Sequence, residues 1–264
     1  MPVIIDTHCH LDSIQYKDDV DSVIQDALLN GVKTFLIPGA SLKDLPRAVM
    51  LSEKYDEVFF AVGVHPYDKD DFDFNILEKY VYHPKCVAIG ECGLDYFRLP
   101  SSCHEKEIEI NLQKEIFIKQ IQFAKKVNKP LIIHIRDASN DSKQILIDYN
   151  AKEVGGVLHC FNAHEDLLEL NQHNFYFGVG GVVTFKNAKK LTSILNKIPL
   201  EKLLIETDSP YLTPHPFRGK RNEPKFTCEV VEKISEILEI PGKDIKNITT
   251  HNAKTLFKEF SRKN

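Results

Sequence analysis

The chain has 264 residues, is 42% hydrophobic and 27% charged, and carries a net charge of −4 at pH 7. This composition is typical of a soluble globular protein with a sizeable core, and it argues against a surface that is basic throughout and coats nucleic acid. No apolar run approaches the length of a transmembrane helix, and residues 1–6 lack the features of a signal peptide. We therefore expect a cytoplasmic protein without membrane contact.

Eight short apolar runs predict β-strands. Strands that are buried in a parallel sheet are apolar along their whole length rather than at alternate positions. The runs cover residues 3–7, 33–38, 58–63, 86–90, 130–134, 155–159, 175–179 and 202–206. The segments between these runs have room for helices.

Those intervening segments show helical periodicity. In the first, one face carries Val20, Val23, Ile24, Ala27 and Leu28. Gly31 follows at a position where helices often end on glycine. The longest helix is predicted over 104–128, and Ser102-x-x-Glu105 before it has the form of a capping box. Later helices are predicted over 164–173, 187–197, 227–239 and 250–260.

Strands and helices that alternate eight times over about 250 residues predict a (β/α)8 barrel of the TIM type, formed by one α/β domain over residues 1–264. A doubly wound open sheet is the structural alternative. Polar residues that follow the first and eighth strands argue for the barrel, because only closure brings these two strands side by side.

Six side chains that commonly bind divalent metals stand at the ends of the apolar runs. They are His8, His10, Glu91, His134, His159 and Asp208. Because the carboxyl ends of barrel strands meet on one face, we expect these side chains to converge there. Four imidazoles and two carboxylates at one place predict a metal-dependent enzyme.

The positions of the ligands suggest different roles. His8 and His10 are two residues apart on a strand, so both can face one ion. Glu91 is a carboxylate that can bridge two ions, which a neutral imidazole cannot do. Asp208 can touch an ion and also accept a proton from water, so Glu91 and Asp208 are the expected catalytic residues. Glu206 lies one step deeper, and we expect at most an indirect role for it.

Three of the six cysteines neighbour the expected ligands. Alternation along a strand turns Cys9, Cys92 and Cys160 away from the ligands, so we interpret them as small buried apolar residues. The cysteines are irregularly spaced and include no Cys-x-x-Cys pair, so a disulfide framework is not expected.

Two further places are candidates for substrate contacts. His65 ends the third apolar run, and Arg218 lies in a long basic connection after Asp208. Arginine can bind a phosphate through two parallel hydrogen bonds. Lys220 and Arg221 in the same connection either contact phosphate or form a solvated basic turn.

At this point the sequence resembles the TatD family of metal-dependent deoxyribonucleases. The resemblance runs from Asp6-x-His8-x-His10 to Thr249-Thr250-His251-Asn252-Ala253 and includes Gly63-Val64-His65-Pro66, Gly90-Glu91-Cys92-Gly93-Leu94-Asp95-Tyr96, His134-Ile135-Arg136-Asp137-Ala138, His159-Cys160-Phe161, Thr207-Asp208-Ser209-Pro210 and Arg218-Gly219-Lys220-Arg221-Asn222. One departure is Asn162-Ala163, where the family more often has Ser-Gly.

The resemblance implies a TIM-like barrel with two metal ions. It implies that His8, His10, Glu91 and Asp208 hold the first ion, and that Glu91, His134 and His159 hold the second. It also implies hydrolysis of DNA phosphodiesters, as a 3′→5′ exonuclease that favours single strands and activates water with two metals. Single-stranded DNA or 3′ ends would then be the partner, and no obligate protein partner is evident.

Two questions stay open at the level of sequence. Imidazole and carboxylate ligands without thiolate suit zinc, manganese, cobalt or iron better than magnesium, which prefers oxygen. The alternative function is a metal-dependent ester or amide hydrolase on the same scaffold, for example one that deacylates mischarged aminoacyl-tRNA. Such barrels often bridge their metals with a modified lysine, whereas the fourth strand here offers Glu91.

Overall fold

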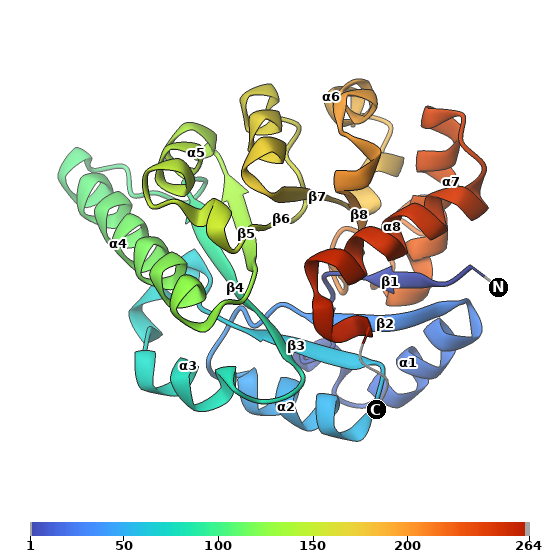
Figure 1. The fold of residues 1–264 in the computed structure, drawn as a ribbon, viewed down its shortest axis with the longest axis horizontal. Coiled ribbons are helices and arrows are strands. Elements are labelled where there is room, and N and C mark those ends of the chain that lie inside the picture. The colour runs from blue at the N-terminus through green and yellow to red at the C-terminus, as the bar shows by residue number, and fades with distance from the viewer. Residues whose placement is uncertain (1, 262–264) are drawn as a thin grey trace.

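The computed structural model describes residues 2–261 and shows eight parallel strands in one sheet (Figure 1). Each strand pairs with the next one along the chain. The strands are β1 Ile4–Asp6, β2 Val32–Ile37, β3 Val58–Val62, β4 Cys86–Asp95, β5 Leu131–Arg136, β6 Gly156–Leu158, β7 Phe175–Val179 and β8 Leu203–Ile205. Every predicted run overlaps one of them, but β2 starts one residue before its run, and β4 and β5 extend five and two residues beyond theirs.

Hydrogen bonds just beyond the strand ends join β1 to β8. The Asp208 amide donates to the carbonyl of His8 at 2.9 Å, and the His10 amide donates to the carbonyl of Ser209 at 2.7 Å. Cys9 and Ser209 form a parallel bridge between the same two segments. The sheet therefore closes nearly completely into a barrel, which confirms the predicted fold over the open-sheet alternative.

Helices surround the sheet (Figure 1). They are α1 Val20–Leu29, α2 Leu45–Lys54, α3 Phe74–Val81, α4 Cys103–Val127, α5 Ser139–Asp148, α6 Lys189–Ile194, α7 Thr227–Leu238 and α8 Gly242–Leu256. In the described part of the chain, none of these helices combines the length and the apolar character needed to cross a bilayer.

Three helix predictions need correction. The segment Glu165–His173 is a 3-10 helix rather than an α-helix. The last helix begins at Gly242, eight residues earlier than predicted, because Pro241 precedes it and fits a helix start. The capping box also does not form, since the Ser102 side chain makes no capping hydrogen bond to α4.

The core has an inner and an outer part. The outer part lies between strands and helices and holds most of the buried apolar side chains. The inner part takes side chains from all eight strands, from the end of α8 and from the segment after it, which includes the 3-10 helix Lys258–Ser261: Ile5, Leu36, Ala61, Val87, Ala88, Ile132, Val157, Tyr176, Leu204, Ala253, Leu256, Phe257 and Phe260. Thr250 of α8 donates to the carbonyl of Val3, just before β1. The last helix therefore covers the amino-terminal end of the barrel and leaves the carboxyl end for the polar residues.

Asn252 ties α8 to the start of β8. Its amide nitrogen donates to the carbonyls of Leu200 and Leu203 at 2.7 and 2.9 Å, and the residue is 3% exposed. We expect Asn252→Ala to lower the free energy of unfolding by about 1–3 kcal/mol, because two buried carbonyls lose their donor. The exposed neighbour gives a matched control, and His251→Ala should stay within about 0.5 kcal/mol. Urea denaturation measures both, and equal stabilities of the two variants would contradict this role.

Candidate metal centre

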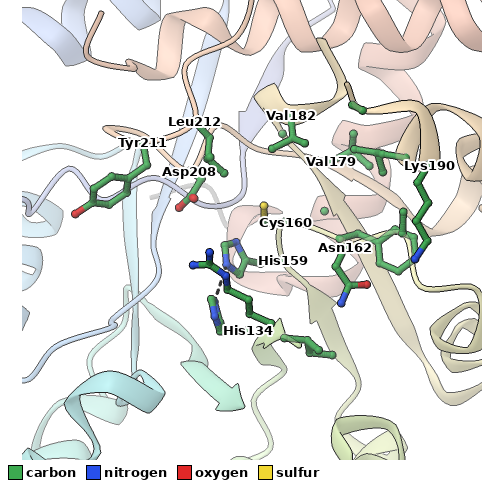
Figure 2. A pocket seen from close by; sticks show the side chains of 18 of the residues that line it. His134, His159, Cys160, Asn162, Val179, Val182, Lys190, Asp208, Tyr211 and Leu212 are labelled. Carbon is green, nitrogen blue, oxygen red and sulfur yellow. Dashed lines mark hydrogen bonds between the residues drawn. The ribbon is translucent and has the colours of Figure 1, made fainter. Parts of the chain in front are cut away.

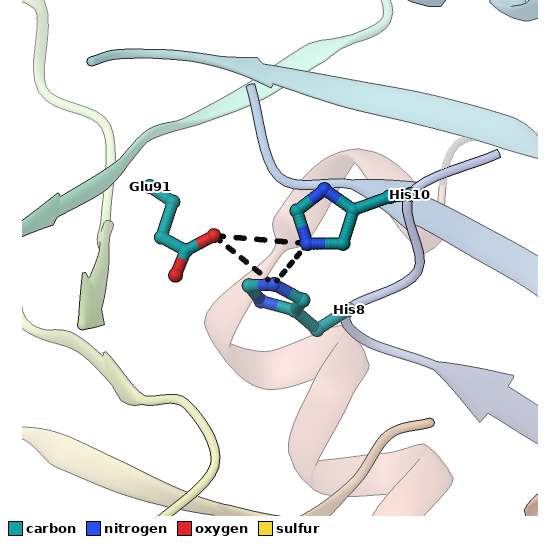
Figure 3. A group of neighbouring side chains, drawn as sticks. All are labelled: His8, His10 and Glu91. Atoms are coloured by element: carbon teal, nitrogen blue, oxygen red, sulfur yellow. Dashed lines mark hydrogen bonds and ion pairs between the residues drawn. The ribbon is translucent and has the colours of Figure 1, made fainter. Parts of the chain in front are cut away.

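The six predicted ligands converge at the carboxyl end of the barrel. His8 and His10 follow β1, Glu91 and His134 lie within β4 and β5, His159 follows β6, and Asp208 follows β8. Figure 3 shows His8, His10 and Glu91 turned toward one another. Two groups of side chains share Glu91 and have their ligand atoms close enough together to hold an ion: His8, His10 and Glu91, and Glu91, His134 and His159.

The first group has the spacing of a tetrahedral site. The Nε2 atom of His8 lies 3.3 Å from Nε2 of His10 and 3.3 Å from Oε2 of Glu91. Oδ1 of Asp208 lies 3.4 Å from His10 and 3.7 Å from His8. Ligand bonds of 2.0–2.2 Å give a tetrahedron with edges of about 3.3–3.6 Å. His10 and Glu91 are 3.8 Å apart. His8, His10 and Glu91 therefore fit one ion of the kind that imidazole and carboxylate bind, and Asp208 lies beside the two histidines.

The second group is built around the other oxygen of Glu91. Oε1 of Glu91 lies 2.9 Å from Nδ1 of His134 and 3.0 Å from Nε2 of His159. The two nitrogens are 3.4 Å apart. Each oxygen of Glu91 thus faces a different group of histidines, which is the arrangement that a bridging carboxylate requires.

The electrostatics centre on the buried carboxylate of Glu91, which is 3% exposed. Burial alone would raise the pKa of Glu91, but the charges of His159 and His8 bring it well below its usual range. Burial alone would lower the pKa of His10, but the hydrogen bond to Asp208 and the charges of Asp208 and Glu91 raise it to about 9. Burial lowers the pKa of His8, so the imidazoles do not all favour the charged form. The carboxylates need positive charge beside them, which divalent ions can supply.

Asp95 is a member of the site that the sequence analysis did not assign. Its Oδ2 lies 3.0 Å from Nε2 of His134, and its Oδ1 accepts the Phe97 amide. Glu91 and Asp95 are four residues apart on β4, so strand parity alone places them on one face. A carboxylate on the far nitrogen of a ligand histidine fixes the orientation of the ring. Asp95 therefore positions His134.

Glu206 lies beyond His159, and it forms with His8 and His159 a further group whose ligand atoms are close together, so its indirect role stays a prediction. Its Oε1 lies 3.5 Å from Nδ1 of His159 and accepts the Cys160 amide. Gly178 makes room for it, because a Cβ at that position would lie 2.2 Å from Oε2 of Glu206. The carboxylate thus lies next to His159 on the side away from Glu91.

A further buried carboxylate joins the first strand to the segment after the last strand. Asp6 accepts the Thr207 hydroxyl at 2.6 Å and the Thr207 amide at 3.0 Å. Burial raises the pKa of the Asp6 carboxyl to about 8, although the hydrogen bonds from Thr207 and His8 oppose the shift. Asn222 donates to the carbonyl of Thr207 at 2.9 Å. These contacts fix the backbone that carries His8 and Asp208.

Of the two predicted substrate contacts, the structure brings His65 to the centre. Its Nδ1 accepts the Tyr67 amide at 3.1 Å, so the neutral ring carries its proton on Nε2. That Nε2 atom lies 3.9 Å from Oε1 of Glu91. Burial lowers the pKa of His65 to about 3. His65 therefore presents a neutral hydrogen-bond donor to the centre.

The basic connection after β8 lies further away. Arg218 donates to the carbonyl of Thr213 at 2.8 Å and stacks over Phe185, and it lines neither cavity at the centre. Its contact with substrate stays a prediction. Arg221 forms an ion pair with Asp19, which favours a structural role for this side chain.

Two cavities open from the centre, and His134, His159, Asp208 and Tyr211 line both. One cavity of about 520 Å³ is polar and includes Asp12, Asp44, Asp68 and Arg98. The other, of about 580 Å³, has mainly apolar walls (Figure 2). Substrate can therefore approach the ligands from two directions.

One cysteine prediction is wrong. Cys9 and Cys92 are buried as expected, whereas Cys160 is partly exposed and lines the apolar cavity (Figure 2). The reason is local, because Cys160 has φ 43° and the alternation of a strand does not hold there. The thiol lies beside the ligands, and burial raises its pKa to about 12.

The departure at Asn162-Ala163 lies at the same cavity. Both residues line it, and Ala163 has φ 59°, a left-handed conformation that glycine adopts without the steric cost of a Cβ. The Ala163 side chain packs in the core at 2% exposure. The departure therefore changes a cavity wall and leaves the metal ligands unaffected.

Comparison with known proteins places this geometry in a family. The family model described as TatD related DNase matches residues 5–258. The chain is 44% identical over 260 residues to a Bacillus subtilis protein named uncharacterized metal-dependent hydrolase YabD, which covers 97% of this chain and 99% of that protein. It is 33% identical to the 3′-5′ ssDNA/RNA exonuclease TatD of Escherichia fergusonii, covering 96% and 98%. The crystal structure of YJJV, a TatD homologue of Escherichia coli, superposes with a TM-score of 0.87 at 29% identity, covering 97% and 98%.

Asp95→Asn tests the positioning of His134. The amide cannot accept from an imidazole as strongly as the carboxylate, so we expect roughly 10- to 100-fold weaker binding at the ion site that includes His134. Competition with a chromogenic chelator, titrated with zinc and with manganese, measures the affinity. Asp137→Asn is the matched control, because this carboxylate is exposed and follows the end of β5. Asparagine also tolerates the left-handed φ of this position. Equal affinities in both variants would refute the role of Asp95.

Proposed function

This chain belongs to the TatD-related DNase family of metal-dependent hydrolases, and we propose that it is a 3′→5′ exonuclease that favours single-stranded DNA. The observation that carries the proposal is Glu91, whose two oxygens face two separate groups of histidines at the open end of the barrel. A relative named as a 3′-5′ exonuclease of single-stranded DNA and RNA supports the choice of substrate.

The ligand set fits two divalent ions, which we propose to be zinc, manganese, cobalt or magnesium. When bound, such ions lower the pKa of coordinated water and stabilise charge on phosphoryl oxygens. Glu91 holds the two groups of ligands together, while His8, His10, His134, His159 and Asp208 complete them. Asp95 and Glu206 orient His134 and His159 from outside.

The other site residues handle protons and charge. The Asp208 carboxylate lines both cavities and accepts the proton of the attacking water. The Nδ1 atom of His65 already accepts a hydrogen bond from the Tyr67 amide. The Nε2–H group is therefore free to donate a hydrogen bond to a phosphoryl oxygen. The proposed phosphate contact of Arg218 requires its guanidinium to leave the carbonyl of Thr213.

The reaction is a hydrolysis at the last phosphodiester of the strand. Water forms a new bond to phosphorus, and the bond from phosphorus to the 3′ oxygen breaks. The 3′ oxygen takes up a proton from solvent, and Asp208 returns the proton of the attacking water to solvent. The products are a nucleoside 5′-monophosphate and a strand that is one nucleotide shorter with a 3′ hydroxyl.

Glu91→Gln and Asp208→Asn test this assignment. We expect each to lower the rate of nucleotide release by at least ~100-fold, because the first weakens the hold on both ions and the second removes the base. End-labelled single-stranded DNA with manganese, zinc or magnesium, followed on a sequencing gel, shows the loss of 3′ nucleotides one at a time. Asp18→Asn, an exposed carboxylate away from the centre, is the control and should keep the wild-type rate.

Two results would overturn the proposal. Turnover like that of the wild type in either site variant would remove Glu91 or Asp208 from the mechanism. Silence on DNA and RNA together with cleavage of an aminoacyl ester would favour the ester hydrolase instead.

A further inference from the structure

The apolar cavity beside the metal centre is a second element of the site that the hydrolysis does not use. It has a volume of about 580 Å³, within the range of small-molecule pockets, and it opens directly on His159 and Asp208. Its walls come from β5, from β7 and from the connections after β6, β7 and β8, and they include Ile135, Phe161, Val179, Val182, Leu191 and Leu212. Ligand pockets typically combine such walls with a few polar groups.

The polar groups of this cavity lie at its rim. Arg136 follows the ligand His134 on β5, and its guanidinium lies 3.5 Å from the centre of the Phe97 ring. Lys190 belongs to α6 and extends toward Asn162 (Figure 2). Among the described residues, neither Arg136 nor Lys190 has an ion-pair partner within 4.0 Å. Two cations thus stand beside an apolar space.

The other cavity has the opposite character. Its charged residues beyond the metal ligands are Asp12, Asp44, Asp68 and a single arginine, Arg98. A phosphate chain is repelled by three carboxylates and attracted by two cations. Of the two approaches to the centre, the one lined by Arg136 and Lys190 is complementary to the terminal nucleotide of a nucleic-acid strand.

We infer that the apolar cavity binds the base of the 3′-terminal nucleotide while the phosphate of that nucleotide lies between the metal ligands and Arg136. This inference rests on the proposed exonuclease function. A base that has left its stack is held by apolar and aromatic side chains in enzymes that act on nucleotides. The cavity has apolar and aromatic side walls of this kind, which come from Phe161, Val179 and Leu191. Because apolar contact with a ring does not depend on its hydrogen-bonding edge, the cavity accepts all bases.

The cavity also gives a physical reason for a preference for single strands. A terminal base can enter it only after it has separated from its partner. Unpairing costs energy in a duplex and nothing in a single strand.

Two oligonucleotides that differ only in the terminal base test the inference. One single strand ends in thymidine, and the other ends in a tetrahydrofuran abasic unit, and both have the same scissile phosphodiester. Metal-loaded wild type should release thymidine monophosphate about 10- to 100-fold faster than the abasic phosphate, the value of one base contact. Val182→Phe narrows the cavity from one wall and should bring this ratio close to one.

Two further variants separate a narrowed cavity from misfolding and from the effect of added side-chain bulk elsewhere in the protein. Leu212→Phe narrows the cavity from the loop after β8 and should reduce the ratio in the same way. Val20→Phe adds the same bulk at a half-buried valine on α1, away from the centre, and should keep both the wild-type rate and the wild-type ratio. Circular dichroism confirms that each variant is folded.

The outcomes separate the two proposals. If the wild type cleaves both strands at the same rate, or if the ratio is unchanged in Val182→Phe and Leu212→Phe, the base pocket is refuted and the exonuclease stands. If the wild type cleaves neither strand, the exonuclease is refuted, and calorimetry then tests the pocket. The metal-loaded wild type should bind thymidine monophosphate about 10- to 100-fold more tightly than 2-deoxyribose 5-phosphate. Equal binding of the two would overturn the pocket.

Discussion

The structure depends on one buried carboxylate at the mouth of the barrel. Glu91 is almost completely enclosed, and an isolated charge at such a place would be costly. Its two oxygens are compensated by imidazoles on opposite sides, from β1 on one side and from β5 and β6 on the other. The same requirement for positive charge makes the place suitable for divalent ions. The burial of Glu91 and the binding of metal therefore depend on the same need for positive charge.

Closure of the barrel is the second condition. His8 and Asp208 are 200 positions apart in the sequence, and the hydrogen bond between their backbones brings their side chains to one point. The Asp6–Thr207 pair and Asn222 reinforce this junction with buried hydrogen bonds. The end of α8 and the turn after it cover the opposite end of the barrel, and the ligands lie at the other end. The two cavities then decide how substrate reaches the ligands.

Much of this arrangement could be predicted from residue patterns. Apolar runs mark buried parallel strands, and the position after each run marks the shared face, so the fold and the convergence of six ligands followed. Features that depend on the local backbone conformation or on distant partners could not be predicted in this way. The left-handed φ of Cys160 cancels the parity argument, the pairing of Arg221 with Asp19 crosses 202 positions, and α8 starts on a Pro-Gly pair that gives no periodic signal. Asp95 shares the parity of Glu91 and was within reach of the same argument.

Anomalous diffraction from crystals grown with manganese or zinc tests the central role of Glu91 most directly. Two anomalous peaks per chain are expected, one about 2.0–2.2 Å from Oε2 of Glu91 beside His8 and His10, and one at the same distance from Oε1 beside His134 and His159. A single peak, or two peaks of which either lies out of reach of Glu91, would contradict the account.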